Sequence, residues 1–211
     1  MNAESFLKQR LLCIVVIDKT ADAVPLAEAL LAGGLSCMEI TFRTAGAADS
    51  IRAIRKNVPQ MSIGAGTLLT ADNVKAAVDA GAQFGVSPGL SEVVSKAARE
   101  NNLPLFPGVV TPTEVMRALE LGWKHLKFFP SETFGGVNVL KALAGPFGHT
   151  GVKFVPTGGI NAATLANYLA VPQVAAVGGS WMADRKLVAE KNWAKITALT
   201  AEAMTIISSM K

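Results

Sequence analysis

Two charged residues lie inside apolar segments of this 211-residue chain, Lys127 within HLKFFP and Glu39 within CMEITF. Burial of a lysine favours its neutral amine, which can attack a ketone and form an electron-withdrawing iminium. Burial of a carboxyl raises its pKa, which suits a general acid/base beside such an iminium. Two other interpretations stay open: a buried ion pair between Lys127 and Glu39, or a lysine whose ammonium reaches solvent.

A guanidinium and a hydroxyl follow two of the apolar segments. Arg43 is four residues beyond Glu39, which is roughly 13 Å in an extended strand. We therefore expect the strand to end near Phe42 and the Arg43 guanidinium to fold back, where it can hold a carboxylate through two parallel hydrogen bonds. Thr67, at the end of GAGT, could add a hydroxyl. The alternatives are a solvent-facing arginine and a threonine that caps the next helix.

Glycine clusters close the last two apolar segments of the chain. Thr157-Gly158-Gly159 ends one, and GGS, residues 178–180, ends the other. Glycine lets backbone N–H groups approach an anion closely, and a following helix N-terminus adds a favourable dipole. Barrels often bind phosphate at the loops after strands seven and eight. The pair of clusters predicts a phosphate site, and tight turns alone are the alternative.

These residues need a framework, and the sequence alternates between strand-like and helix-like segments. Eight short apolar runs predict buried strands, at residues 11–17, 37–42, 62–67, 83–88, 103–109, 125–130, 153–157 and 174–178. Helical spacing marks residues 22–32, 71–80 and 92–101, and the last helices are expected after Trp181. Thr111 and Glu114 form a capping box. Expected helix ends are the N-caps Thr20, Thr70, Ser91 and Asn161 and the glycines at 33–34, 81 and 122.

Strict strand–helix alternation predicts a parallel sheet with helices outside it. Eight units favour a closed (β/α)8 TIM barrel, preceded by a short N-terminal helix over residues 1–10, with residues 1–211 as a single domain. In such barrels the active site lies at the C-terminal ends of the strands. An open doubly wound sheet is the alternative, although no G-x-G-x-x-G follows Ile17.

Composition excludes several classes of protein. The longest apolar run is residues 11–17, too short to cross a membrane, and we see no signal peptide, so a cytoplasmic protein is expected. The net charge of +4 favours anionic substrates, but no basic stripe interleaved with aromatics indicates nucleic acid binding. The two cysteines are expected to be buried free thiols. No metal is expected, since the two histidines and two cysteines lack ligand spacing, and no G-x-S-x-G indicates a serine hydrolase.

Together the motifs resemble one family, the 2-keto-3-deoxy-6-phosphogluconate (KDPG) / 4-hydroxy-2-oxoglutarate (KHG) aldolases. They occur in the family's order from the first expected strand to about Trp181: EITFRT (39–44), GAGT (64–67), KFFP (127–130) with a glycine pair at 135–136, PTGG (156–159) and GGS (178–180). The chain departs from the family at Phe42, where we expect leucine before Arg43, and this bears on substrate choice rather than on the lysine chemistry.

The resemblance implies a class I aldolase, a carbon–carbon lyase of the Entner–Doudoroff pathway. It would reversibly cleave 2-dehydro-3-deoxy-6-phosphogluconate to pyruvate and D-glyceraldehyde 3-phosphate, and 4-hydroxy-2-oxoglutarate to pyruvate and glyoxylate. No cofactor is implied, and a homotrimer is typical. Lys127 matches the Schiff-base lysine and Glu39 the general acid/base. The substrate-binding matches are Arg43 and Thr67 for the carboxylate, Pro88 and Phe129 for the pyruvyl pocket, Thr157 for the hydroxyls, and Gly158, Gly159, Gly179 and Ser180 for the phosphate.

Three alternatives remain at this point. The substrate could be the galactonate epimer of the sugar acid. The chain could be a phosphate-binding isomerase or synthase that uses Glu39 as a base without a covalent intermediate, which the glycine clusters support equally. It could also be a non-catalytic sugar-phosphate binder, although a buried Lys–Glu pair is a costly way to build a passive site.

Overall fold

The computed structural model describes residues 4–210, in which short parallel strands form two curled sheets. One sheet has the order β5-β4-β3-β2-β1-β9, and the other has the order β6-β7-β8. The strands are β1 (Leu11–Val15), β2 (Cys37–Thr41), β3 (Ser62–Gly66), β4 (Phe84–Val86), β5 (Leu105–Phe106), β6 (Gly108–Val109), β7 (His125–Phe128), β8 (Lys153–Pro156) and β9 (Val177–Gly179).

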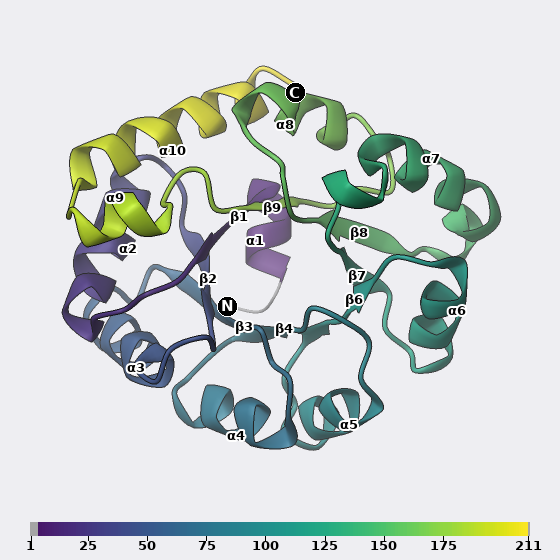
Figure 1. Cartoon of the computed structure of the whole chain (residues 1–211), viewed down its shortest axis with the longest axis horizontal. Helices are drawn as coiled ribbons and strands as arrows, with labels where there is room; N and C mark the ends of the chain where they lie inside the picture. The colour runs from purple at the N-terminus through teal and green to yellow at the C-terminus, as the bar shows by residue number, and fades with distance from the viewer. Residues whose placement is uncertain (1–3, 211) are drawn as a thin grey trace.

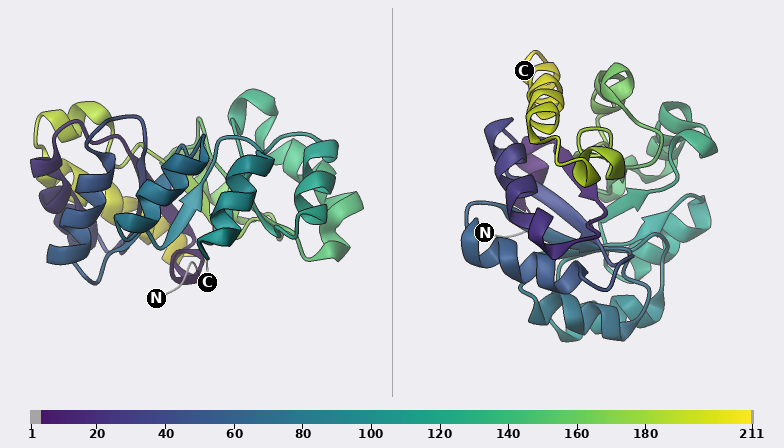
Figure 2. Two further views of the ribbon diagram at one scale, coloured as in Figure 1. Left: turned by 90° about the horizontal axis from the view of Figure 1, so that it is seen from below. Right: turned by 60° about the vertical axis from the view of Figure 1, so that its left-hand side comes forward.

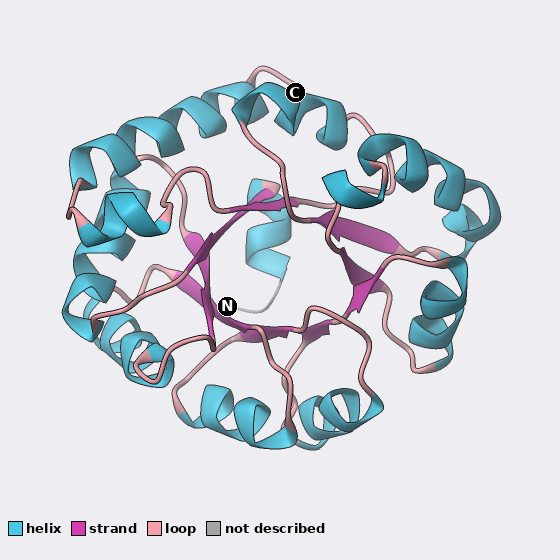
Figure 3. Ribbon diagram, in the orientation of Figure 1, coloured by secondary structure: helices cyan, strands magenta, loops and turns pink. Residues whose placement is uncertain are grey.

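Helices surround the two sheets, as Figures 1 and 3 show. They are α1 (Glu4–Gln9), α2 (Ala23–Ala32), α3 (Ala47–Asn57), α4 (Ala71–Asp79), α5 (Glu92–Glu100), α6 (Pro112–Glu120), α7 (Gly136–Phe147), α8 (Ala162–Leu169), α9 (Arg185–Ala189) and α10 (Trp193–Ser208). Helix α1 lies across one end of the curled sheets (Figure 2). Its Leu7 side chain packs against the core. The predicted N-terminal helix is confirmed over Glu4–Gln9, and residues 1–3 lie outside the described residues. None of the described helices combines the length and apolar character needed to span a bilayer.

The predicted strand over residues 103–109 is wrong as a continuous element. Pro107 separates β5 from β6, and the two short strands pair in different sheets. Proline has no N–H to donate to a ladder, whereas its carbonyl accepts a hydrogen bond from the Lys127 N–H at 2.9 Å. On the other side, the bridge between Thr157 and Gly178 brings β8 against β9. Parallel pairing therefore continues from one sheet toward the other at β8–β9, and one chain segment contributes to both sheets at Pro107.

Most of the expected helix ends are confirmed. Thr70, Ser91 and Asn161 each accept a backbone N–H at the start of α4, α5 and α8, and the capping box of Thr111 and Glu114 begins α6. Gly34, Gly81 and Gly122 take the left-handed conformation after helices, with φ of +91°, +89° and +76°. Thr20 as an N-cap is wrong, because it begins a 3₁₀ turn (Thr20–Asp22) and Asp22 precedes α2 without a side-chain cap.

The core lies on both faces of the sheets, which explains the apolar character of the strand segments. Every residue of β2 and of β3 is buried, and α2, α3 and α10 pack their apolar sides around the larger sheet. Cys13 and Cys37 are buried free thiols, as expected, and the Cys37 thiol donates to the Leu11 carbonyl. A polar side chain on one of these strands therefore has little access to water unless it lies at a strand end.

Candidate active site

A cavity of about 370 Å³ opens where the parallel strands end. The loops that follow the strands form its rim, so its floor and walls come from segments far apart in the sequence. All eleven residues predicted from the sequence line it: Glu39, Arg43, Thr67, Pro88, Lys127, Phe129, Thr157, Gly158, Gly159, Gly179 and Ser180. The tertiary structure thus brings every predicted site residue to one place.

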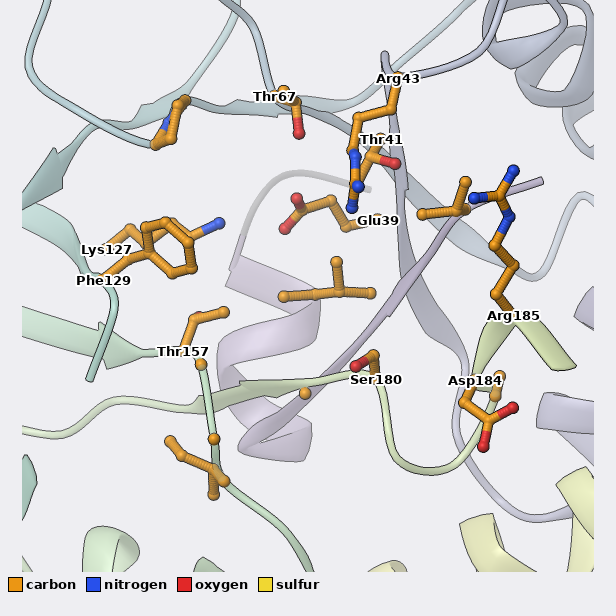
Figure 4. A pocket seen from close by; sticks show the side chains of 18 residues that line it. Glu39, Thr41, Arg43, Thr67, Lys127, Phe129, Thr157, Ser180, Asp184 and Arg185 are labelled. Atoms are coloured by element: carbon orange, nitrogen blue, oxygen red, sulfur yellow. The ribbon is translucent and has the colours of Figure 1, made fainter. Parts of the chain in front are cut away.

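Lys127 and Glu39 form the floor of the cavity, and their side chains point toward one another (Figure 4). Lys127 on β7 is 7% exposed and Glu39 on β2 is 1% exposed. Within the described part of the chain, no ion pair joins them, and both Glu39 carboxylate oxygens lack a hydrogen-bond partner. The buried ion pair considered as an alternative is therefore wrong, although the two side chains do share one site.

The electrostatics of Glu39 follow from its burial. Loss of water around the carboxylate raises its pKa from the usual 4.5, and the nearby Lys127 opposes part of that rise. A second, smaller cavity of about 10 Å³ lies against Glu39, Lys127 and Thr157, close to the space that one water molecule needs. A carboxyl with a raised pKa in this setting can exchange protons with a group held above it.

Gly66 makes the space that Glu39 occupies. A Cβ at Gly66 would overlap Oε1 of Glu39 and would stand 2.5 Å from its Cδ and 2.7 Å from its Cγ. Any other residue at the end of β3 would therefore displace the Glu39 side chain from its present position. The role of this glycine could not be predicted from the GAGT motif, because nothing in the sequence shows that β2 and β3 pair Thr41 with Gly66.

Arg43 and Thr67 lie at the opposite rim from the glycine clusters. Strand β2 ends at Thr41, one residue earlier than expected, and the Arg43 side chain turns inward above Glu39 (Figure 4). Thr67 has a φ of +57°, which is strained for a β-branched residue. The helix-capping alternative for Thr67 is wrong, since Thr70 caps α4. A guanidinium and a hydroxyl thus face the same end of the cavity.

The glycine clusters form the other rim. Gly158 and Gly159 have φ of +101° and +82°, a backbone conformation that favours glycine. The loop after β7 holds this segment, because Ser131 N–H donates to the Thr157 carbonyl and Glu132 N–H donates to the Gly158 carbonyl, at 2.8 and 3.1 Å. The chain can therefore present backbone amides and the Ser180 hydroxyl to an anion at this rim.

An aromatic ring and an arginine complete the surroundings. The Lys127 Nζ lies 4.9 Å from the centre of the Phe129 ring, close enough for a cation–π contact when the lysine is charged. Arg185, at the start of α9, also lines the cavity and pairs with Asp18. Arg185 was not predicted as a site residue, because it lies in a polar helical stretch with no signal beyond its charge. Among residues 4–210, no cluster of histidine, cysteine, aspartate and glutamate could hold a metal.

Comparison with known proteins places the chain in a family. The family described as KDPG and KHG aldolase matches residues 3–199. The 2-dehydro-3-deoxy-phosphogluconate aldolase of Treponema pallidum (strain Nichols) is 44% identical over 207 residues, 98% of each chain. The KHG/KDPG aldolase of Escherichia coli (strain K12) is 46% identical over 191 residues, 90% of this chain and 89% of the relative.

A solved structure agrees with these relatives. KDPG aldolase from Legionella pneumophila, with pyruvate captured at low pH as a covalent carbinolamine intermediate, superposes with a TM-score of 0.88 at 41% identity. The match covers 92% of this chain and 93% of the Legionella chain. By sequence over nearly its whole length and by fold, this chain belongs to the KDPG and KHG aldolase family.

Proposed function

We propose that the chain is a class I aldolase that reversibly cleaves 2-dehydro-3-deoxy-6-phosphogluconate to pyruvate and D-glyceraldehyde 3-phosphate. One observation carries this proposal: a buried lysine amine faces a buried carboxyl that makes no ion pair with it, at the floor of a cavity with a cationic rim. The family relatives named for this reaction support it.

In the proposed reaction the neutral Lys127 amine attacks the substrate ketone and gives a carbinolamine, which loses water to form an iminium. The iminium then accepts the electron pair of the bond that joins the carbon next to it to the hydroxyl-bearing carbon. As that bond breaks, the hydroxyl loses its proton and the departing carbon becomes the aldehyde. The enamine that remains is protonated at carbon, and water then releases pyruvate and restores the lysine. Glu39, which forms the floor of the cavity together with Lys127, would carry these protons, with a water as its relay.

The rims supply binding. Arg43 and Thr67 would hold the substrate carboxylate, which suits the bidentate geometry of a guanidinium. Pro88 and Phe129 would enclose the pyruvyl part, and Thr157 would lie beside the substrate hydroxyls. The amides of Gly158, Gly159 and Gly179 and the hydroxyl of Ser180 would bind the phosphate. All of these residues line the cavity, with the two sets on different rims.

We extend the proposal to 4-hydroxy-2-oxoglutarate, cleaved to pyruvate and glyoxylate. The E. coli relative carries both activities in its name. This substrate shares the keto acid that Lys127 and Arg43 would recognise and has no phosphate. Its cleavage would therefore not need a phosphate at the glycine-lined rim.

We also propose that the two sheets close into one (β/α)8 barrel within a single domain. The parallel bridges from Phe154 to Val174 and from Thr157 to Gly178 support closure on one side. On the other side, the shared segment around Pro107 links the sheets. The homotrimer expected from the family resemblance stays a prediction, which sedimentation equilibrium would test.

Borohydride reduction with pyruvate tests the proposed chemistry. The native protein should gain one reduced pyruvyl group, and peptide mapping should place it on Lys127. Lys127→Met should gain none and lose cleavage, while Lys124→Met, which removes an exposed lysine three residues earlier, should behave as the native protein. Lack of an adduct would favour the non-covalent isomerase or synthase. A coupled assay with the gluconate, galactonate and hydroxyoxoglutarate substrates would fix the preferred epimer.

A further inference from the structure

An ion pair bridges two loops at the edge of the cavity. The Arg185 guanidinium donates to both carboxylate oxygens of Asp18, with Nε at 2.8 Å from Oδ2 and Nη2 at 2.7 Å from Oδ1. Asp18 follows β1 and Arg185 follows β9, and these strands pair directly. The parallel pairing therefore delivers both side chains to the same rim, next to the glycine cluster that ends β9.

The positions of the cavity's charges assign this arginine to the phosphate end. The charged residues that line the cavity are Lys127, Arg43, Arg185, Glu39 and Asp184. Lys127 and Glu39 form the floor, and Arg43 stands above Glu39. Figure 4 shows Arg185 across the cavity from Lys127. Among the cationic lining residues, Arg185 is the one on the chain segment that continues directly from Ser180 and the glycine cluster of β9, five residues further on.

The neighbouring carboxylates of Asp184 and Asp18 leave the Arg185 guanidinium able to bind a phosphate. Asp184 caps α9 by accepting the Leu187 N–H at 2.9 Å, and its carboxylate points away from the cavity centre in Figure 4. The Asp18–Arg185 pair is open to water, with side-chain exposures of 42% and 65%. Exposed pairs contribute little to stability and exchange partners easily. A phosphate carries more charge than one carboxylate and accepts two parallel bonds from a guanidinium.

We propose that Arg185 is a specificity-determining residue that exchanges Asp18 for the substrate phosphate. With the cavity empty, Asp18 holds the guanidinium at the rim. When the phosphorylated keto acid enters, the guanidinium transfers to the phosphate and closes that end of the cavity, and Asp18 returns to water. The inference rests on the proposed aldolase function and adds to it the residue that favours phosphorylated over unphosphorylated substrates.

The test compares kcat/KM for 2-dehydro-3-deoxy-6-phosphogluconate with kcat/KM for 4-hydroxy-2-oxoglutarate. Arg185→Met should lower this ratio by about tenfold, the loss expected for one charge-assisted contact at a partly exposed site, and should do so through the KM of the phosphorylated substrate. Lys186→Met is the matched control, since it removes the next positive charge on α9 from a side chain that is 82% exposed and outside the cavity lining. Its ratio should equal that of the native protein.

Asp18→Asn tests the exchange. If Arg185 must leave Asp18, this variant should lower the KM for the phosphorylated substrate by up to about fivefold, the value of an exposed pair. In the double variant with Arg185→Met the gain should vanish. An unchanged ratio in Arg185→Met, or a raised KM in Asp18→Asn, would overturn the inference. Failure of the aldolase proposal itself looks different, because the native protein would then form no pyruvate adduct and cleave neither substrate.

Discussion

Replacing Gly66 by alanine should impair Glu39 while leaving Lys127 in place. The new Cβ would overlap Oε1 of Glu39 and stand 2.5 Å from Cδ, so the carboxyl must move by about 1–1.5 Å to reach ordinary van der Waals contact. A displacement of this size in a catalytic group costs about 100-fold in rate, which lies within the range that general acid/base catalysis contributes. We expect kcat for cleavage to fall by about 100-fold.

The steric strain of Gly66→Ala should also lower the free energy of unfolding, because Gly66 and Glu39 are both buried. Overpacking of a tight interior typically costs about 1–3 kcal/mol, which urea unfolding would measure. Pyruvate and borohydride should still label Lys127, since the lysine itself is not displaced. This combination, a slow enzyme that still traps pyruvate, separates loss of the acid/base from loss of the nucleophile.

Gly145→Ala provides the matched control for that experiment. Gly145 lies in α7, and a Cβ there meets nothing within 4 Å. The control should keep native kcat and gain slightly in stability, since alanine favours helix. A folded Gly66→Ala protein that cleaves substrate at the native rate would refute the assignment of Glu39. Cleavage could not then depend on the present position of the Glu39 carboxyl.

Three further outcomes are expected. Burial favours the protonated form of Glu39 and raises its pKa above 4.5. Because kcat/KM needs the carboxylate to accept a proton, the acid limb of its pH profile should lie above pH 4.5. An acid limb at or below pH 4.5 would contradict this role. Burial raises the pKa of Cys13 to about 12 and that of Cys37 well above 9.0. At pH 8 about one Cys13 thiol in 10⁴ is therefore reactive thiolate, so labelling by a thiol reagent should occur only as the protein unfolds. Rapid labelling of the folded protein would disprove this expectation. Thr111→Ala removes the capping box with Glu114 and should lower the free energy of unfolding by about 1 kcal/mol in urea titration, whereas no change would show that α6 does not depend on its cap.

Local rules account for the parts of the fold that the sequence predicted well. Strands buried on both faces are mostly apolar, so β1, β2, β3 and β7 are predicted as short, largely apolar runs. Their ends were less certain, because nothing local marks the residue at which pairing stops. The expected strand over residues 174–178 shows this: Val174 makes only an isolated bridge, and β9 begins at Val177.

The lysine and the glutamate were found because a charge within an apolar run violates the local pattern. That signal depends only on residue types and identifies no partner. It could not decide between an ion pair and two separate groups, since the distance between β2 and β7 depends on how the sheets curl. In the structure the two side chains approach without pairing, which is the arrangement that the proposed reaction needs.

Most strands, the charged residues within apolar runs, and the glycine clusters that could approach an anion are predictable from the amino-acid sequence. All of these follow from rules that act over a few neighbouring residues. The contact of Gly66 with Glu39 and the ion pair of Asp18 with Arg185 at the rim are visible only in the folded chain. Both contacts join segments that are distant in sequence, and such contacts exist only after parallel pairing has fixed which strand ends are neighbours.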